Sequence, residues 1–390
     1  MNNFNYSNPT QVVFGKDQLE QLDTLVPAHA RVLITYGGGS VKKFGTLERV
    51  KQALQSTTRT IFEFGGIEAN PQLATLLQAV ELARTEKIDY LLAVGGGSVM
   101  DGTKFIALAT PAEQYQGKEA ELMRHGFGAV PVDTAIPLGT VVTLPATGSE
   151  MNGFAVISDG HEKLPVFSPL TYPTFSILDP ELTYSLPSRQ VANGVADTFV
   201  HILEQYITYP VDGRLQDRIA EGILQTLIEV GSTTIAEPEN YDARANLFWC
   251  SSLALSGIVS AGVPQDWTTH MIGHEMTALF GLDHARTLAI VQAPLWKHRK
   301  SQKQAKLAQF AERVWGVTEG SESEKADQAI EKTEAFFRSL GMTTTLAENN
   351  LGESDIPKVI ASLEKHGMTA LSETDDFTLA DAEAVLKLAL

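Results

Sequence analysis

The stretch YLLAVGGGSVMD, residues 90–101, decides which fold we expect for this chain. Residues 90–94 are apolar throughout, which is typical of a parallel strand buried on both faces. They lead into residues 95–98 (GGGS), and helical spacing follows to about residue 110. Glycines let the backbone approach a ligand closely, and the first turn of the next helix directs N–H groups at an anion. By itself the stretch predicts either a pyrophosphate-binding turn or a plain tight turn.

A second turn of the same kind lies upstream. Residues 31–36 (RVLITY) are β-branched and bounded by glycine, which predicts a strand, and residues 37–40 (GGGS) precede helical spacing over residues 41–55. Strand, glycine turn and helix begin a nucleotide-binding α/β unit, and two such turns favour nucleotide binding over two plain turns. Neither turn matches G-x-G-x-x-G, so neither turn is the common dinucleotide-binding fingerprint.

The remaining periodicity divides the chain in two. Other predicted strands are residues 11–15, 60–64, 135–144, 154–157 and 175–178, with a helix at residues 70–86. From about residue 186 helical spacing takes over, in residues 188–208, 215–235, 244–260, 267–280, 288–297, 304–315, 325–340 and two shorter segments. We therefore predict an α/β dinucleotide-binding domain over residues 1–185 and an all-α domain over residues 186–390.

The composition of the chain argues against some classes of binding partner. The net charge is −17 and the chain has a single cysteine, Cys250, in an apolar setting. The acidic balance argues against nucleic acid and anionic membranes, and no run of about 18 apolar residues suggests a membrane span. The first residues lack a signal-peptide pattern, and one cysteine excludes an internal disulfide. We expect a cytoplasmic protein in a reducing compartment.

Residues 267–284 (WTTHMIGHEMTALFGLDH) hold three of the nine histidines: His270, His274 and His284. His270 and His274 are one helical turn apart, and a glycine-containing turn precedes His284. The predicted helix 188–208 carries Asp197 and His201 with the same spacing. One carboxylate with two or three imidazoles suits Zn²⁺ or Fe²⁺ rather than Ca²⁺ or Mg²⁺. A metal site is predicted, suited to polarising a carbonyl oxygen beside a nicotinamide cofactor.

The first glycine turn bears on the choice of nicotinamide cofactor. NAD sites commonly place an acidic residue on the adenosine ribose, and a carboxylate there would repel the 2′-phosphate of NADP. Residues 37–40 contain no acid, and Lys42 and Lys43 follow. We therefore expect NADP(H), although the two lysines are equally consistent with a solvated helix face.

Taken together, these stretches resemble the iron-containing (group III) alcohol dehydrogenases, and within them the butanol dehydrogenase branch of NADPH-dependent aldehyde reductases. The resemblance covers essentially the whole chain. It rests on separated stretches in the family's order: VLITYGGGSVKK, FGGIEANP, LLAVGGGSVMDGTKF, TLPATGSE, ANGVADTFVH, GVPQDWTTHMIGHE and GLDHARTLAI.

The resemblance implies an α/β dinucleotide-binding domain followed by an all-α metal-binding domain, the architecture shared with dehydroquinate synthase. It implies that the metal ligands are Asp197, His201, His270 and His284, and that His274 lies close to the nicotinamide. Asp197, His201 and His274 are then the catalytic residues. The implied cofactor-binding residues are Gly37, Gly38, Gly39, Ser40, Asn70, Gly95, Gly96, Gly97, Ser98, Asp101, Thr143, Leu144, Thr147, Ser149 and Lys163.

The implied activity is hydride transfer between NADPH and aldehydes or primary alcohols, with one Zn²⁺ or Fe²⁺, in a cytoplasmic homodimer. One alternative is a metal-dependent lyase of the dehydroquinate synthase type, which uses its nicotinamide cofactor only transiently. A non-catalytic nucleotide- or metal-binding protein is the other alternative.

Overall fold

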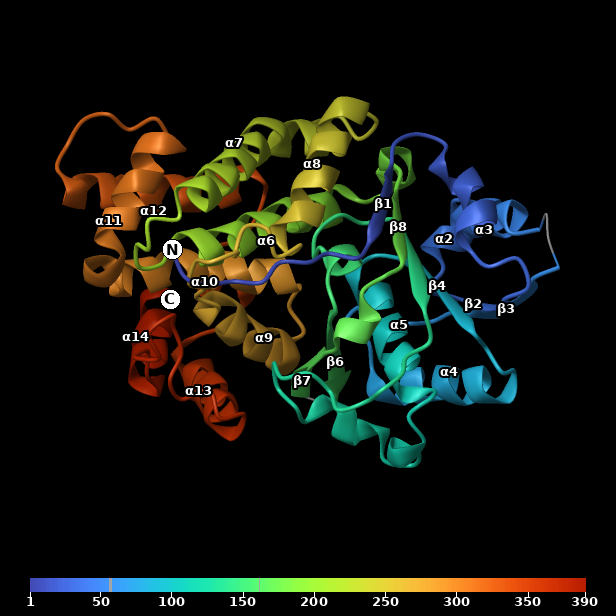
Figure 1. The fold of residues 1–390 in the computed structure, drawn as a ribbon. Helices are drawn as coiled ribbons and strands as arrows, with labels where there is room; N and C mark the ends of the chain where they lie inside the picture. Colours follow the sequence, from blue (N-terminus) through green and yellow to red (C-terminus); the bar gives the residue numbers. More distant parts are fainter. Residues whose placement is uncertain (56–57, 161) are drawn as a thin grey trace. The chain divides into compact units, whose positions relative to one another are not determined.

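The computed structural model describes residues 1–55, 58–160 and 162–390 (Figure 1). These residues form two compact units, one over Ser7–Leu186 and one that joins Met1–Tyr6 to Pro187–Leu390. The N-terminal residues belong to the second unit because the Asn2 N–H donates to the Gly262 carbonyl oxygen at 2.9 Å.

The first unit is built on a parallel sheet. Within the described residues its six strands follow the order β1–β8–β5–β4–β2–β3. They are β1 (Gln11–Phe14), β2 (Arg31–Tyr36), β3 (Thr60–Phe64), β4 (Tyr90–Gly95), β5 (Leu138–Val142) and β8 (Phe175–Leu178). A separate antiparallel pair is formed by β6 (Phe154–Asp159) and β7 (Glu162–Phe167). Every residue of β4 and β5 is buried, as their apolar sequences predict.

The helices of this unit are α1 (Leu22–Leu25), α2 (Ser40–Lys43), α3 (Thr46–Ala53), α4 (Leu73–Thr85) and α5 (Gly97–Ala109). The prediction of one helix over residues 41–55 is wrong, because Gly45 has φ 77° and separates α2 from α3. The helix expected from residue 70 begins at Leu73, because Asn70 has φ 60°, which a right-handed helix does not allow. These differences leave the predicted strand–turn–helix order intact.

Register brings three strand ends together. β4 lies between β2 and β5, with Tyr36 opposite Val94 and Gly95 opposite Val142. The turns that follow these strands therefore share one edge of the sheet. The chain proceeds from β2 to β3 on one side and returns to β4 on the other, so this edge includes a topological switch point, where open α/β sheets bind ligands.

The second unit is helical (Figure 1). Its helices are α6 (Ser188–Tyr206), α7 (Arg214–Ala236), α8 (Tyr241–Ala254), α9 (Thr268–Phe280), α10 (His284–His298), α11 (Lys300–Arg313), α12 (Glu322–Ser339), α13 (Ile356–Lys365) and α14 (Leu379–Leu388). Helix α6 packs against α7, α8 and α10, and every residue from Gly194 to Tyr206 is buried. The predicted fold class, an α/β unit followed by a helical unit, is confirmed.

Several helix ends in this unit differ from the predicted bounds, by up to six residues. Helix α8 ends at Ala254 rather than near residue 260, and Gly257, with φ 86°, follows in a left-handed conformation. Helix α10 begins at His284, four residues earlier than expected, directly after Gly281 ends α9 with φ 68°. The second difference matters because it places His284 in the first turn of a helix. None of the described helices is long and apolar enough to cross a membrane.

Candidate active site

Helix α6 supplies the first half of the metal site. Asp197 and His201 are buried one turn apart on this helix, and His201 Nε2 lies 3.7 Å from Asp197 Oδ1. His270, on α9, places its Nε2 3.8 Å from the same oxygen. His284, at the start of α10, places its Nε2 at 3.7 Å. Three imidazole nitrogens from three helices thus converge on one carboxylate oxygen.

The geometry of this group fits a bound ion. Separations of 3.7–3.8 Å are too long for hydrogen bonds. They are close to the roughly 3.4 Å between neighbouring ligands around an ion bound at about 2.1 Å. Ligand atoms of Asp197, His201 and His270 all lie within 4.8 Å of one another. His270 Nε2 is buried with no hydrogen-bond partner in the part of the chain that the structure describes, which is costly unless something binds it.

Glu204, which the sequence reasoning missed, orients His270. One of its carboxylate oxygens accepts the His270 backbone N–H at 3.1 Å, and the other is hydrogen-bonded to His270 Nδ1. A carboxylate on Nδ1 leaves Nε2 directed at a metal, a common outer arrangement for histidine ligands. Glu204 lies seven residues after Asp197, on the same face of α6, so helical spacing could have revealed it.

Burial and neighbouring charges shift the pKa of His270 in opposite directions. Burial tends to lower the pKa of His270, but the carboxylates of Glu204 and Asp197 raise it to about 9. Burial lowers the pKa of His201 to about 4. Burial also raises the pKa of Glu204. A cation held at His270 Nε2 would therefore compete with a proton there, as at metal ligands generally.

His274 lies beside the group. Its ring centroid is 4.8 Å from that of His284 and 6.0 Å from that of His270. The metal-ligand group found among the described residues contains Asp197, His201 and His270, and neither His274 nor His284. His284 Nε2 lies 3.7 Å from Asp197 Oδ1, whereas His274 is placed by its ring contacts with His270 and His284.

The other predicted site lies at the ends of β4 and β5. A Cβ at Gly96 would meet the Leu144 side chain at 3.1 Å, and one at Gly97 would meet Thr147 at 2.5 Å. Thr143 donates its N–H to the Gly95 carbonyl at 2.9 Å. The glycines are therefore required by the loop that packs on them. The start of α5 at Gly97 leaves its first N–H groups available to an anion.

The turn after β2 is more open. A Cβ at Gly38 or Gly39 would meet no described atom within 4 Å, whereas one at Gly37 would lie 3.1 Å from the Ile67 carbonyl oxygen. Asn70 donates its N–H to Ser98 Oγ at 3.2 Å, which links the segment before α4 to the turn after β4. Since the Gly66 N–H also donates to the Gly37 carbonyl at 3.1 Å, residues 37–40, Asn70 and Ser98 lie near one edge of the sheet.

Asp101 and Ser149 are joined to each other inside the unit. Ser149 Oγ donates to one Asp101 oxygen at 2.7 Å, and the Val156 N–H donates to the other at 2.9 Å. Lys104, also missed from sequence, is fully buried and donates to Ser149 Oγ, its carbonyl, and the Phe154 carbonyl at 2.6–2.8 Å. Burial raises the pKa of Asp101 and lowers that of Lys104 to about 8. Lys163 is buried on β7, opposite Ser158.

Comparison with known families identifies the group of proteins. The family described as "Iron-containing alcohol dehydrogenase" matches residues 9–180, and "Fe-containing alcohol dehydrogenase family, C-terminal" matches residues 191–390. The chain belongs to the iron-containing alcohol dehydrogenase family. The predicted resemblance and the predicted class of enzyme, an alcohol dehydrogenase or aldehyde reductase, are confirmed.

Two members of the family are similar to this chain over nearly the whole length of both proteins. The chain is 54% identical to the NADPH-dependent aldehyde reductase YqhD of Escherichia coli, over 97% of each chain. It is 36% identical to the probable NADH-dependent butanol dehydrogenase 1 of Bacillus subtilis, over 100% of each.

Solved structures of the family have the same fold. The substrate- and cofactor-free aldehyde reductase YqhD from E. coli has a TM-score of 0.92 at 51% identity, with both chains covered to 100%. The NADH-dependent butanol dehydrogenase A of Thermotoga maritima has a TM-score of 0.93 at 32% identity, covering 100% of this chain and 99% of the other. Within the family both NADPH- and NADH-dependent relatives therefore occur.

Proposed function

We propose that this family member is an NADPH-dependent aldehyde reductase of broad specificity, which transfers hydride between NADPH and aldehydes or primary alcohols with the help of one divalent metal ion. The observation that carries the proposal is the convergence of three imidazole nitrogens on Asp197 Oδ1. The 54% identity to an NADPH-dependent aldehyde reductase supports the same reaction.

In this proposal Asp197, His201, His270 and His284 hold the metal, which when bound supplies a Lewis acid for a carbonyl oxygen. Glu204 keeps the proton of His270 on Nδ1, so that Nε2 is the ligand atom. Burial of Asp197, His201 and His270 excludes water and strengthens their interactions with charge. His274, beside His284, is the candidate group for handing a proton to the product oxygen.

The α/β unit is proposed to bind the cofactor. Residues 95–98 and the start of α5 hold the diphosphate, and residues 37–40 with Asn70 lie at the adenosine ribose. The absence of an acidic residue from 37–40 favours NADPH over NADH. The other residues assigned to this site are Asp101, Thr143, Leu144, Thr147, Ser149 and Lys163.

Several finer features belong to the same proposal. The donor set accepts Fe²⁺ or Zn²⁺, and the family's name favours iron. We propose a homodimer in the cytoplasm, with a cofactor-binding domain over Ser7–Leu186 and a metal-binding domain that joins Met1–Tyr6 to Pro187–Leu390, so that the boundaries predicted at residues 1–185 and 186–390 change only at Met1–Tyr6 and Leu186. Sedimentation equilibrium of the purified protein tests the dimer: a monomer mass at micromolar concentration contradicts it.

The decisive experiment follows absorbance at 340 nm with butanal and either NADPH or NADH. The protein is assayed as purified, after chelation, and after Fe²⁺ or Zn²⁺ is restored without air. We expect NADPH oxidation that chelation abolishes and metal restores, with slower NADH oxidation. If no net oxidation of either cofactor occurs with metal supplied, the proposed reductase is wrong, and a lyase or a binding protein takes its place.

A further inference from the structure

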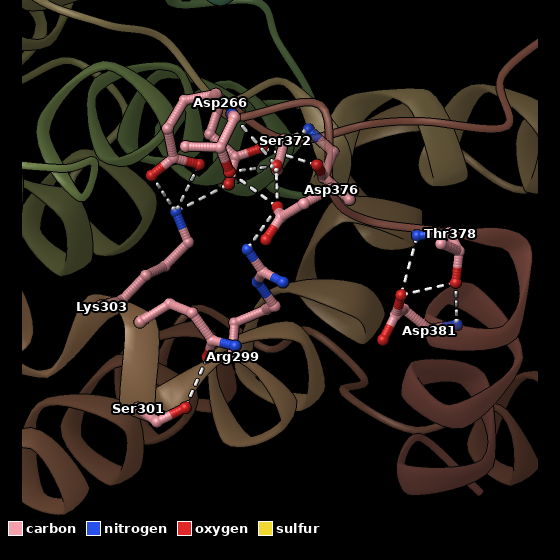
Figure 2. Close-up of polar contacts among 12 residues, drawn as sticks. Asp266, Arg299, Ser301, Lys303, Ser372, Asp376, Thr378 and Asp381 are labelled. Atoms are coloured by element: carbon pink, nitrogen blue, oxygen red, sulfur yellow. Dashed lines mark hydrogen bonds and ion pairs between the residues drawn. The ribbon is translucent and has the colours of Figure 1, made fainter.

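A buried lysine contacts the segments that flank two helices of the metal site. Lys303, on α11, is 2% exposed, and Figure 2 shows its ammonium directed into a group of carboxylates. It lies 2.8 Å from Asp266 Oδ2 and donates to Glu373 Oε1 at 2.9 Å and to the Ile207 carbonyl at 2.9 Å. The three N–H groups of the ammonium thus have three acceptors from three separate segments.

Two of these acceptors lie next to the ends of helices that carry metal ligands. Ile207 directly follows α6 as its C-terminal cap. Asp266 precedes α9, where its Oδ1 accepts the Thr268 N–H at 3.0 Å and the Thr268 hydroxyl at 2.6 Å. The Asp266 N–H in turn donates to the Glu204 carbonyl at 2.8 Å. Lys303 therefore connects the end of α6 to the start of α9.

The connection through Lys303 affects the distance between the ligands on α6 and the ligand on α9. Asp197 and His201 lie on α6, whereas His270 lies in the first turn of α9, two residues after Thr268. A shift of the start of α9 along α6 would move His270 Nε2 away from Asp197 Oδ1. A metal site tolerates only small errors in ligand position.

The third acceptor comes from near the C-terminus. Glu373 lies in the segment 372–376, which is also held by Asp376: its Oδ1 accepts from Arg299 at 2.7 Å and from Ser372 Oγ at 2.8 Å (Figure 2). Burial opposes ionisation of Asp266, but the Lys303 ammonium holds the pKa of Asp266 below its usual value. Burial raises the pKa of Glu373. Lys303 and Asp266 thus form a buried ion pair inside the unit.

We propose that Lys303 is a positioning residue for the metal site, which holds the start of α9 against the end of α6 and so keeps His270 at its distance from Asp197. The inference rests on the metal site of the proposed function. Lys303 touches neither metal nor substrate, so it acts through Asp266 and the backbone of α6.

The test uses the full chain loaded with Co²⁺, whose visible absorption reports ligand geometry. Lys303→Met removes the ammonium at similar length, and Asp266→Asn breaks the ion pair while keeping an acceptor for Thr268. Lys306→Met is the matched control, because Lys306 is also buried on α11 and also contacts the end of α6, over the Tyr206 ring, but it pairs with Asp217 on α7 at 2.7 Å rather than with Asp266 before α9. Loss of Co²⁺ to excess chelator is timed by absorbance, and circular dichroism verifies the fold.

We expect Lys303→Met and Asp266→Asn to lose Co²⁺ about tenfold faster than the unchanged chain, with altered absorption bands, and Lys306→Met to match the unchanged chain. If Lys303→Met fails to fold, Asp266→Asn decides the question. Folded variants that release Co²⁺ as slowly as Lys306→Met, with the same bands, overturn the positioning role alone. An unchanged chain that binds no Co²⁺ overturns the proposed metal site and this inference together.

Discussion

The two units of this protein build their sites from different parts of the polypeptide. In the helical unit the candidate ligands are side chains of buried, ionisable residues, brought together from α6, α9 and α10. In the α/β unit the candidate site is mostly backbone, lined by glycines and by the first N–H groups of α5. A metal ion needs nitrogen and carboxylate donors that only side chains supply, whereas a diphosphate accepts hydrogen bonds from the main chain.

This difference predicts different sensitivity to substitution. The metal site has only a few ligands, so when one ligand is lost no neighbouring side chain takes its place. Main-chain donors are spread over several residues, so one substitution removes little unless an added atom displaces the loop. The following substitutions test this contrast, from the largest expected effect to the smallest.

Asp197→Ala should have the largest effect. The oxygen on which three imidazoles converge is lost. We expect metal content near zero and kcat/KM for butanal lower by about 10³-fold, because the polarising charge is lost. Metal analysis and the NADPH assay measure both. NADPH binding, followed by its fluorescence, should be unchanged, and a variant that keeps its metal and its rate contradicts the assigned ligand set.

Glu204→Gln should weaken the site without removing a ligand. The amide keeps an acceptor for the His270 N–H but no longer holds the Nδ1 proton as a carboxylate does. Substitution of such outer partners typically costs about 10–100-fold in metal affinity. Competition with a chromophoric chelator measures the dissociation constant. An affinity equal to that of the unchanged chain would mean that Glu204 is not what orients His270.

Gly97→Ala should affect the cofactor and spare the metal. The added Cβ would lie 2.5 Å from the Thr147 side chain, so the loop over α5 must shift. We expect the dissociation constant of NADPH to rise about tenfold, which corresponds to about 1.4 kcal/mol. Fluorescence titration measures it, and metal content is determined in parallel.

Gly222→Ala, on α7, is the control for Gly97→Ala, because its Cβ would meet no described atom within 4 Å and the residue lies outside the proposed cofactor site. Its NADPH binding should therefore equal that of the unchanged chain. If Gly97→Ala binds NADPH as tightly as Gly222→Ala does, the loop on α5 does not shape the cofactor site. A loss of metal in Gly97→Ala would show that the two sites are not independent.

Ser40→Asp should have the smallest effect. Ser40 is exposed, and a carboxylate there would repel a 2′-phosphate through solvent, which is worth about 1 kcal/mol at close range in water. We expect kcat/KM with NADPH to fall about fivefold, while the value with NADH changes less. Raising the salt concentration should reduce the difference, since exposed charges are screened. Equal falls for both cofactors would remove this residue from the ribose site.

Much of the α/β unit was predictable because strands are local patterns. Residues 31–36, 60–64 and 175–178 form strands at the predicted bounds. β7 was not predicted, because its sequence EKLPVF contains a proline and a charged start, and it forms only by pairing with β6. The strand expected over residues 135–144 shortens to Leu138–Val142, as Pro137 has no N–H for the ladder.

The amino-acid sequence by itself determined the fold class, the two glycine turns and the spacing of Asp197, His201, His270 and His284, because these depend on neighbours within a few residues. Only the tertiary structure decided that three imidazoles meet at one oxygen. It also revealed the buried contacts of Glu204, Lys104 and Lys303. Their partners lie far away in the chain, for example 66 residues between Glu204 and His270. Such contacts follow from helix packing, which local periodicity does not encode.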